Sequence, residues 1–311
     1  MSAAAHCTDL VSLSRHLGFA PQHIFYLVNM ADDLYIKARL PKKSASSRSK
    51  YRTIYIPRAE LKGVQRSILR NVLQDYEVSR HAYAYVQGKS IVDAAVHLSG
   101  RKSVYKFDLI DFFPSISSSR VFGLFSSLGF NETTSWILMR LCTYDGALCQ
   151  GAPTSPYISN LVCRSLDHSL GRLANTWGLD YLRYSDDMYF FGAKNFRYRV
   201  FKNYVRPIIS ENGFRIHNRK TKYCPLGRPR FTLGLATHGD KPALSKDTRR
   251  RYRAAFFKAS RDLKWARENL ERLAGMGEWH RAVYGQDEMY REYQKIINNV
   301  REIKLHERYA I

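Results

Sequence analysis

Hydrophobic and polar residues follow two different periods along the chain, and these periods predict both helices and strands. Apolar residues at helical spacing predict amphipathic helices in residues 1–40 and in the segment that begins at Ala59. Between them, residues 52–56 alternate as a half-buried strand does and stop at Pro57, after a basic, serine-rich loop. We expect a basic hairpin here that extends into solvent.

Segments with strand periodicity and segments with helical periodicity also alternate in the rest of the chain. A short apolar run from Ser103 to Pro114 predicts a strand and a turn, and residues 180–192 predict a β-hairpin. The further predicted elements are a helical stretch at 118–144, a helix after the Gly/Pro loop at 150–156, a helix near 197–212, short strands and turns at 213–237, and long helices from about residue 240. This mixture of strands and helices predicts an α+β fold.

The charge of the chain narrows the possible partners. Its 311 residues include 50 Lys and Arg against 27 Asp and Glu, a formal net charge of +23. Such a balance is typical of a nucleic-acid binder. A basic surface that faces anionic lipid is the alternative, but the sequence has no apolar run of about 18 residues and no signal-peptide layout. Its five cysteines have no metal-site spacing, which predicts free thiols in a reducing cytoplasm.

Two adjacent carboxylates, Asp186 and Asp187, interrupt the aromatic hairpin. A solvated turn would explain this pair by itself. However, Asp108 ends another apolar strand, and two neighbouring strands would bring all three carboxylates together, where they cannot all ionise without cations between them. Carboxylate oxygens are preferred ligands of Mg²⁺, and two such ions about 3.5–4 Å apart catalyse in-line nucleotidyl transfer. The sequence therefore predicts a two-metal site at Asp108, Asp186 and Asp187.

Other residues are candidates for binding a nucleotide substrate. The loop from Gln150 to Pro156 is open at Gly151, which suits close approach to a base pair or sugar, although it is also an ordinary entry to a helix. Phe113 follows Asp108 by five positions, so its ring is a candidate for excluding a sugar 2′-hydroxyl or else a core residue.

Cationic side chains are candidates for binding the triphosphate. Arg52 and Arg58 flank the strand of the basic hairpin and would clamp phosphates there, unless they belong to a solvated loop face. Lys220 is a candidate proton donor to the departing pyrophosphate.

The order of these motifs resembles that of bacterial retron reverse transcriptases. The resemblance runs from about Arg52 to Thr237 and rests on "RTIYIP", "FDLIDFFPSI", "QGAPTSPYISNL", "RYSDDMYF" and "HNRKT". It implies a right-hand polymerase fold with an antiparallel palm sheet flanked by helices, and Mg²⁺-dependent DNA synthesis from dNTPs on an RNA template. The implied divisions are N-terminal helices and fingers at 1–104, palm at 105–239 and a basic helical thumb at 240–311.

The resemblance also implies roles for single residues. Asp108, Asp186 and Asp187 would hold two Mg²⁺ ions, together with the backbone carbonyl of Leu109. The residues that would bind the incoming nucleotide are Arg52 at the triphosphate, Asp111 and Phe113 in the pocket with Phe113 at the sugar, and Gln150 and Gly151 at the nucleotide and its template base. Lys220 would donate the proton.

The biological activity that the resemblance implies is the synthesis of branched RNA-linked DNA, known as msDNA. The enzyme would bind its cognate noncoding RNA, prime from a guanosine 2′-hydroxyl, and act with a retron effector protein in anti-phage defence. Host RNase H would remove the copied template, because the residues after 239 suffice only for a thumb. A reverse transcriptase that uses a 3′ primer, like those of group II introns, and a non-catalytic RNA scaffold that restrains a toxin remain the alternatives.

Three positions depart from the family pattern. Asp93 stands where these enzymes usually have Asn, Leu233 interrupts the usual Val-Thr-Gly, and Ser185 replaces Ala before the Asp pair. The first two departures lie in regions linked to recognition of the noncoding RNA, so they bear on RNA identity. The exchange of Ala for Ser is small, and we expect activity to survive it.

Overall fold

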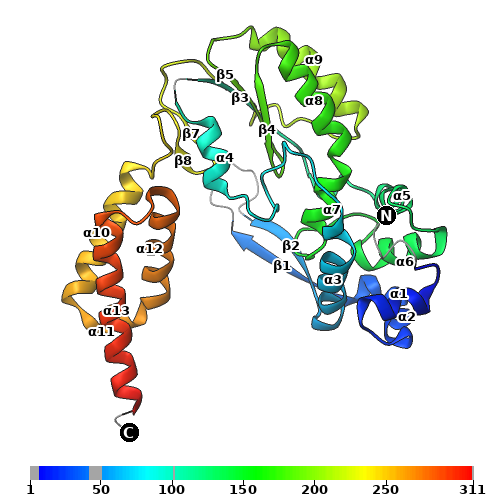
Figure 1. The fold of residues 1–311 in the computed structure, drawn as a ribbon, viewed down its shortest axis with the longest axis horizontal. Helices are drawn as coiled ribbons and strands as arrows, with labels where there is room; N and C mark the ends of the chain where they lie inside the picture. Colours follow the sequence, from blue (N-terminus) through cyan, green and yellow to red (C-terminus); the bar gives the residue numbers. More distant parts are fainter. Residues whose placement is uncertain (1–6, 42–50, 101, 310–311) are drawn as a thin grey trace. The chain divides into compact units, whose positions relative to one another are not determined.

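The computed structural model describes residues 7–41, 51–100 and 102–309, which form two compact units (Figure 1). The first unit comprises residues 1–89, 105–192 and 196–223, and the second comprises residues 90–104, 193–195 and 224–311. The middle of the predicted basic hairpin, residues 42–50, lies outside the described residues.

The first unit contains most of the helices in the described part of the chain. These are α1 (Leu10–Leu17), α2 (Pro21–Asn29), η2 (Ala31–Leu34), α3 (Ala59–Asn71), η3 (Leu73–Asp75), α5 (Ser118–Ser127), α6 (Glu132–Cys142), α7 (Ser155–Val162), α8 (Arg164–Thr176) and α9 (Tyr198–Glu211). They surround one large apolar core.

A four-stranded sheet carries the predicted carboxylates. Its strands are β3 (Ser103–Asp108), β4 (Asp180–Tyr184), β5 (Asp187–Gly192) and β6 (Lys222–Cys224), in the order β4-β5-β3-β6. β4 and β5 form the predicted antiparallel hairpin, with Tyr184 opposite Asp187. Helices α8 and α9 lie against this sheet (Figure 1), and Phe190 of β5 packs on Phe201 of α9 with ring centroids 4.9 Å apart. The sheet is therefore anchored by aromatic packing beneath the Asp-bearing turn.

The N-terminal helical prediction is wrong for its last residues. Tyr35–Pro41 is a strand, β1, which pairs antiparallel with β2 (Tyr51–Pro57). This stretch has alternation as well as helical spacing, since Lys37 and Arg39 alternate with Ala38 and Leu40. The backbone hydrogen bonds to β2 decide between the two periods, and Pro41 is incompatible with a continuing helix. The hairpin itself is confirmed.

The long helical stretch predicted at 118–144 is two helices instead of one. α5 and α6 are separated by Gly129, which has φ +98°, a conformation that interrupts a helix and that glycine adopts without a side-chain clash. Asn131 then caps α6, because its side chain accepts a hydrogen bond from the N–H of Thr134.

The second unit is mostly helical, as the periodicity of the C-terminal residues predicts. Its elements are α4 (Ile91–Leu98), the two-stranded β7 (Phe231–Thr232) and β8 (Leu235–Ala236), α10 (Lys246–Arg261), α11 (Leu263–Glu268), α12 (Leu270–Tyr284) and α13 (Glu288–Tyr309). Phe256 and Tyr293 stack in its core with centroids 3.7 Å apart. Among the described residues, no helix combines the length and apolar character that a membrane crossing requires.

Two departures from the family pattern have a structural account in the second unit. Asp93 completes a capping box at the start of α4, because it accepts hydrogen bonds from the backbone N–H and hydroxyl of Ser90. These bonds lower the pKa of Asp93, so its carboxylate stays charged at the helix N-terminus. Leu233 and Gly234 form the β7–β8 turn, and Leu233 has φ +55°, a conformation that costs a branched residue energy.

Candidate active site

Three carboxylates meet where β3 ends and the β4–β5 turn begins. Oxygen atoms of Asp108, Asp186 and Asp187 all lie within 4.8 Å of one another. Two backbone connections hold them there, because β5 lies next to β3 and the N–H of Leu109 donates to the carbonyl oxygen of Asp186 at 3.0 Å. The sequence prediction that these three residues converge agrees with this geometry.

The electrostatics of the cluster favour a bound cation. Burial and the neighbouring Asp108 raise the pKa of Asp186 above its usual value. Burial likewise raises the pKa of Asp187 to about 6, even though Lys106 opposes that shift. Both shifts reflect the cost of placing several negative charges together with little water. A divalent cation bound to the three carboxylates would offset that cost.

Two lysines contact the cluster. Lys220 Nζ lies 3.1 Å from Asp108 Oδ1, and Lys106 Nζ lies 2.7 Å from Asp187 Oδ2. The hydroxyl of Tyr189 also donates to Asp187 Oδ2 at 3.0 Å. Lys220 was among the sequence candidates, whereas Lys106 was missed. Its position was a usable signal, because it precedes Asp108 by two residues and side chains two apart share one face of a strand.

The turn that carries Asp186 has unusual backbone geometry. Ser185 has φ +60°, a conformation that costs a non-glycine residue about 1–3 kcal/mol and that recurs at functional sites. Tyr85 and Asp111 also have positive φ, at +62° and +44°. The Tyr85 hydroxyl is 3.1 Å from Ser185 Oγ. The surrounding contacts must therefore hold this turn in place.

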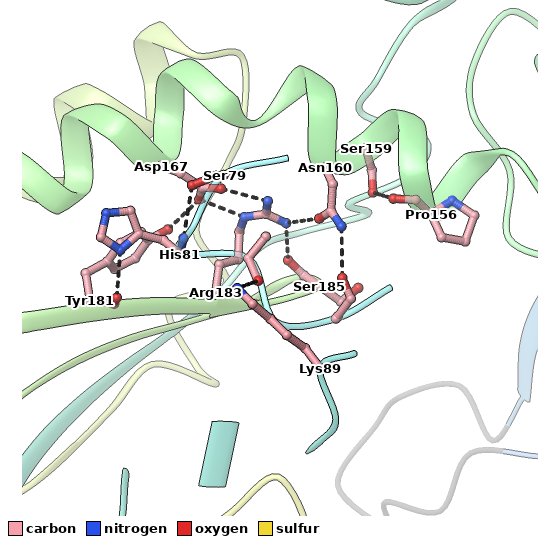
Figure 2. Close-up of polar contacts among 12 residues, drawn as sticks. Ser79, His81, Lys89, Pro156, Ser159, Asn160, Asp167, Tyr181, Arg183 and Ser185 are labelled. Atoms are coloured by element: carbon pink, nitrogen blue, oxygen red, sulfur yellow. Dashed lines mark hydrogen bonds and ion pairs between the residues drawn. The ribbon is translucent and has the colours of Figure 1, made fainter. Parts of the chain in front are cut away.

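A buried polar network beneath the turn supplies such contacts (Figure 2). Arg183, in β4, is wholly buried and donates from Nε and Nη2 to the two carboxylate oxygens of Asp167, each at 2.8 Å. Its Nη1 donates to Asn160 Oδ1 at 3.0 Å and to the carbonyl oxygen of Ser185 at 3.3 Å. Asn160 in turn donates to the carbonyl oxygen of Ala84 at 2.8 Å. The sequence analysis missed this network, because its members lie on α7, α8 and β4.

The candidate sugar gate lies near the same turn. Phe113 is 8% exposed, and its ring centroid lies 6.3 Å from that of Tyr85 and 5.4 Å from that of Phe112. Phe113 thus packs against core residue Phe112 and also lies close to Tyr85, whose hydroxyl is within hydrogen-bonding distance of Ser185. Asp111, two residues earlier, is exposed. Among the described residues, Asp111 has no hydrogen bond or ion pair to the three carboxylates.

The Gln150–Gly151 loop is fixed against the β1–β2 hairpin. The N–H of Tyr55, in β2, donates to the carbonyl oxygen of Gln150 at 2.7 Å. Gly151 has φ +122°, and a Cβ atom there would lie 2.3 Å from the carbonyl oxygen of Tyr55. Only glycine permits this approach. Arg52 is exposed on the same strand, so β2 places the loop and the arginine in one region of the first unit.

Comparison with known proteins agrees with this geometry. The profile of the family described as reverse transcriptase (RNA-dependent DNA polymerase) matches residues 40–250. The chain is 32% identical over 246 residues to the retron Ec86 reverse transcriptase of Escherichia coli, covering 79% of this chain and 76% of that protein. It is 34% identical over 276 residues to the retron Mx162 reverse transcriptase of Myxococcus xanthus, covering 78% of this chain and 56% of that protein.

A solved structure has a similar fold. Telomerase from Candida tropicalis, determined in complex with a fragment of telomeric RNA, superposes with a TM-score of 0.51 at 11% sequence identity. The superposition covers 89% of this chain and 54% of the telomerase chain. At this identity the likeness concerns the fold alone, and it agrees with the expected right-hand polymerase architecture.

Proposed function

Because this chain belongs to the retron reverse transcriptases and is therefore an RNA-directed DNA polymerase, we propose that it makes msDNA from a noncoding RNA that it binds. Synthesis would start at a guanosine 2′-hydroxyl of that RNA and leave a short single-stranded DNA joined to it by a branch. The observation that carries the proposal is the convergence of Asp108, Asp186 and Asp187 in a chain whose relatives are retron enzymes.

The donor set fits Mg²⁺. Three carboxylates whose oxygens lie within 4.8 Å of one another offer hard ligands, and burial raises the pKa of two of them, Asp186 and Asp187, which a bound cation would oppose. The backbone carbonyl of Leu109 would complete the set, since Leu109 directly follows Asp108. When bound, two Mg²⁺ ions supply activation of the attacking hydroxyl and charge stabilisation at the departing pyrophosphate.

The two lysines would act on protons and charge around the reaction. Lys220 would donate a proton to the pyrophosphate oxygen as the phosphodiester bond forms. Its side chain is 57% exposed and bonded to Asp108, so it is free to swing toward the triphosphate once Asp108 has another cation. Lys106 would hold Asp187 in the orientation that the structure shows.

The remaining candidates would select the nucleotide. We assign Phe113 to exclusion of the sugar 2′-hydroxyl, Asp111 to the wall of the same pocket, and Arg52 to the triphosphate. Gln150 and Gly151 would face the incoming nucleotide and its template base. Support for the last assignment comes from the contact of this loop with Tyr55, which aligns it with the strand that carries Arg52.

The larger assignments follow the polymerase fold. We assign residues 1–104 to N-terminal helices and fingers, 105–239 to the palm and 240–311 to a thumb that binds nucleic acid through its basic helices. We further propose a cytoplasmic enzyme whose RNA template is removed by host RNase H, and which works with a retron effector protein in anti-phage defence.

The experiment that tests the proposal is purification of the protein after expression with its flanking genomic DNA. The bound nucleic acid is run on a denaturing gel before and after RNase and debranching enzyme, beside the Asp186→Asn/Asp187→Asn variant. We expect a short DNA that shifts on debranching and is absent from the variant. Unbranched DNA would instead indicate a polymerase that uses a 3′ primer, and RNA alone on both proteins would contradict synthesis.

A further inference from the structure

A basic hollow lies in the first unit, on the outer side of helix α8. It has a volume of about 480 Å³ and is formed by residues 77–81 and the exposed face of α8. Its cationic and imidazole side chains are Arg80, His81, Arg164, His168 and Arg172, and the one carboxylate among its lining residues is Glu77. None of the three catalytic carboxylates belongs to this lining.

The spacing on α8 places these side chains in one row. Arg164, His168 and Arg172 are four residues apart and all exposed, so they share one face of the helix. The opposite face is buried and includes Asp167, the partner of Arg183. The helix therefore supports the catalytic turn with one face and presents positive charge with the other.

Local packing fixes the other wall of the hollow. A Cβ atom on Gly171 would lie 2.5 Å from His81 Nε2, so the glycine makes room for the imidazole against α8. His81 Nδ1 lies 3.0 Å from the carbonyl oxygen of Tyr181 and must donate to it, which leaves Nε2 as an acceptor. Arg80 Nε donates to that Nε2 at 3.4 Å. The guanidinium of Arg80 is thus held at the hollow, and within the described residues its Nη groups have no hydrogen-bond partner.

The positive charges of the hollow have no acidic partners in the part of the chain that the structure describes. Arg80, Arg164 and Arg172 form no ion pair among those residues, although the chain pairs other cations such as Arg140 with Asp32. Like charges held close together repel, and a solvated basic surface would tolerate them only through screening. A ligand with regularly spaced negative charge fits such a row better than a single anion does.

We propose that this hollow binds the phosphate backbone of an RNA strand at a point separate from the catalytic carboxylates. The inference rests on the RNA-directed activity, since an RNA template that extends beyond the catalytic duplex needs a surface to follow.

A second hollow lies between the basic hollow and the turn that carries Asp186. Residues 77–80 also line a hollow of about 670 Å³ that includes Tyr76, Tyr85 and Tyr157, and Tyr85 bonds Ser185 of the catalytic turn. Proteins commonly bind single-stranded nucleic acid by stacking bases on aromatic rings and by placing cationic side chains along the phosphate backbone.

The test compares two charge-reversal variants of the full chain. Arg164→Glu/Arg172→Glu alters the hollow, and Arg66→Glu/Arg70→Glu reverses two exposed arginines on α3 as a control with the same net charge. Affinity is measured by fluorescence anisotropy for a short RNA–DNA hybrid, and for the same hybrid with a long single-stranded extension of RNA or of DNA at either end. Thermal unfolding and dNTP incorporation on the short hybrid check the fold and the catalytic site. If the Glu variant does not fold, Arg164→Gln/Arg172→Gln takes its place.

The expected result is a loss of affinity only for the hybrid that carries the RNA extension. The hollow variant should bind the RNA-extended hybrid at least about tenfold more weakly at physiological salt, with a salt slope reduced by about 1.4, because two phosphate contacts are lost. Its affinity for the short hybrid and its incorporation rate should stay unchanged, and the α3 control should bind every probe as the original chain does. Equal losses in both variants, or no loss in the hollow variant, would overturn the proposal. A loss seen only with the DNA extension would also overturn it and assign the hollow to the product strand.

Discussion

The guanidinium of Arg183 and the carboxylate of Asp167 form a wholly buried, two-pronged ion pair, with both N–O distances at 2.8 Å. Burial by itself would lower the pKa of Arg183, but Asp167 raises it above its usual value, so the arginine stays charged. A buried pair of this kind adds little net stability compared with apolar residues of the same volume. Its use here is positional, because the same guanidinium binds the carbonyl oxygen of Ser185, next to Asp186.

Replacement of Asp167 by Asn should therefore impair metal binding as well as stability. Removing one partner of a buried pair costs about 3–5 kcal/mol of unfolding free energy. Leu170→Ala, on the same buried face of α8, is the control, since it should cost about 2–5 kcal/mol without removing a hydrogen-bond partner of Arg183. Mn²⁺ titration followed by electron paramagnetic resonance should show weaker binding in Asp167→Asn only. Equal weakening in both variants would mean that the pair matters for folding alone.

The stability of the metal-free protein should fall as pH rises through about 6. Burial raises the pKa of Asp187 to about 6, so its neutral form is favoured in the fold. A carboxyl whose pKa is raised by folding stabilises the folded protein at a pH below the pKa of the unfolded chain. This contribution, at most about 3 kcal/mol of unfolding free energy, is lost as the pH rises through the folded pKa. Thermal unfolding in EDTA should show the decline, and Asp187→Asn should flatten it.

Mg²⁺ should reverse that decline. Metal binds the ionised carboxylates and competes with protons, so the rise in unfolding temperature on adding Mg²⁺ should be larger at about pH 7.5 than at about pH 5.5. Differential scanning fluorimetry measures both. The Asp186→Asn/Asp187→Asn variant should show no rise at either pH, and a rise there would place the stabilising metal elsewhere.

Phe113→Val should weaken discrimination against ribonucleotides. If the ring excludes a 2′-hydroxyl, the ratio of kcat/KM for dNTP to that for rNTP should drop by about 10- to 100-fold. Phe112→Val is the control, because Phe112 is also buried but packs on Phe214. Single-nucleotide incorporation assays give the ratios. An unchanged ratio in Phe113→Val would make this residue a core aromatic only.

Gly151→Ala should disturb the proposed nucleotide site through β2. The new Cβ would clash with the carbonyl oxygen of Tyr55, 2.3 Å away, and φ +122° disfavours alanine. A displacement of about 1 Å in a substrate-binding group costs about 100-fold in rate, so kcat/KM for dNTP should fall by that order. Gly123→Ala, in an exposed helical position with open space around it, should leave kinetics unchanged and raise stability by about 0.5–1 kcal/mol.

Lys220→Ala should lower kcat by about 100-fold or more if the lysine is the proton donor. The rate-pH profile should lose its alkaline limb in this variant, a change that a purely structural lysine would not produce. Lys222→Ala, two residues later and exposed, is the control and should keep both rate and profile. A profile that keeps its alkaline limb in Lys220→Ala would reject the assignment.

Sequence patterns predicted the strands that carry the three carboxylates well, because these strands carry strong local signals. Asp108 and the Asp186–Asp187 pair each interrupt an apolar run, and a buried carboxylate in such a place has few structural uses. The hairpin turn was placed nearly correctly, except that Asp187 already belongs to β5. Where local signals conflicted, as in residues 35–41, pairing with β2 decided the outcome and the prediction failed.

The supporting residues were beyond prediction for a different reason. Asp167 looks like a helical surface residue in sequence, and Arg183 like one more cation of a basic chain. Their burial depends on α8 lying against β4, a tertiary contact that no periodicity specifies. Tyr85 was missed for the same reason. Its hydrogen bond to Ser185 joins residues 100 positions apart, and nothing local in the sequence indicates its φ of +62°.

The strand order β4-β5-β3-β6 has a consequence for the chain while it is being made. β3 is translated before its two neighbours in the sheet, β5 and β6. Its backbone hydrogen-bonding groups therefore stay unpaired until translation has passed Gly192 for β5 and Cys224 for β6. At about 5–20 residues per second, that wait lasts several seconds. Until Asp186 and Asp187 have been added, the nascent chain holds Asp108 without the two carboxylates that share its cluster. The candidate metal site therefore forms only after β4 and β5 have been translated and β5 has paired beside β3.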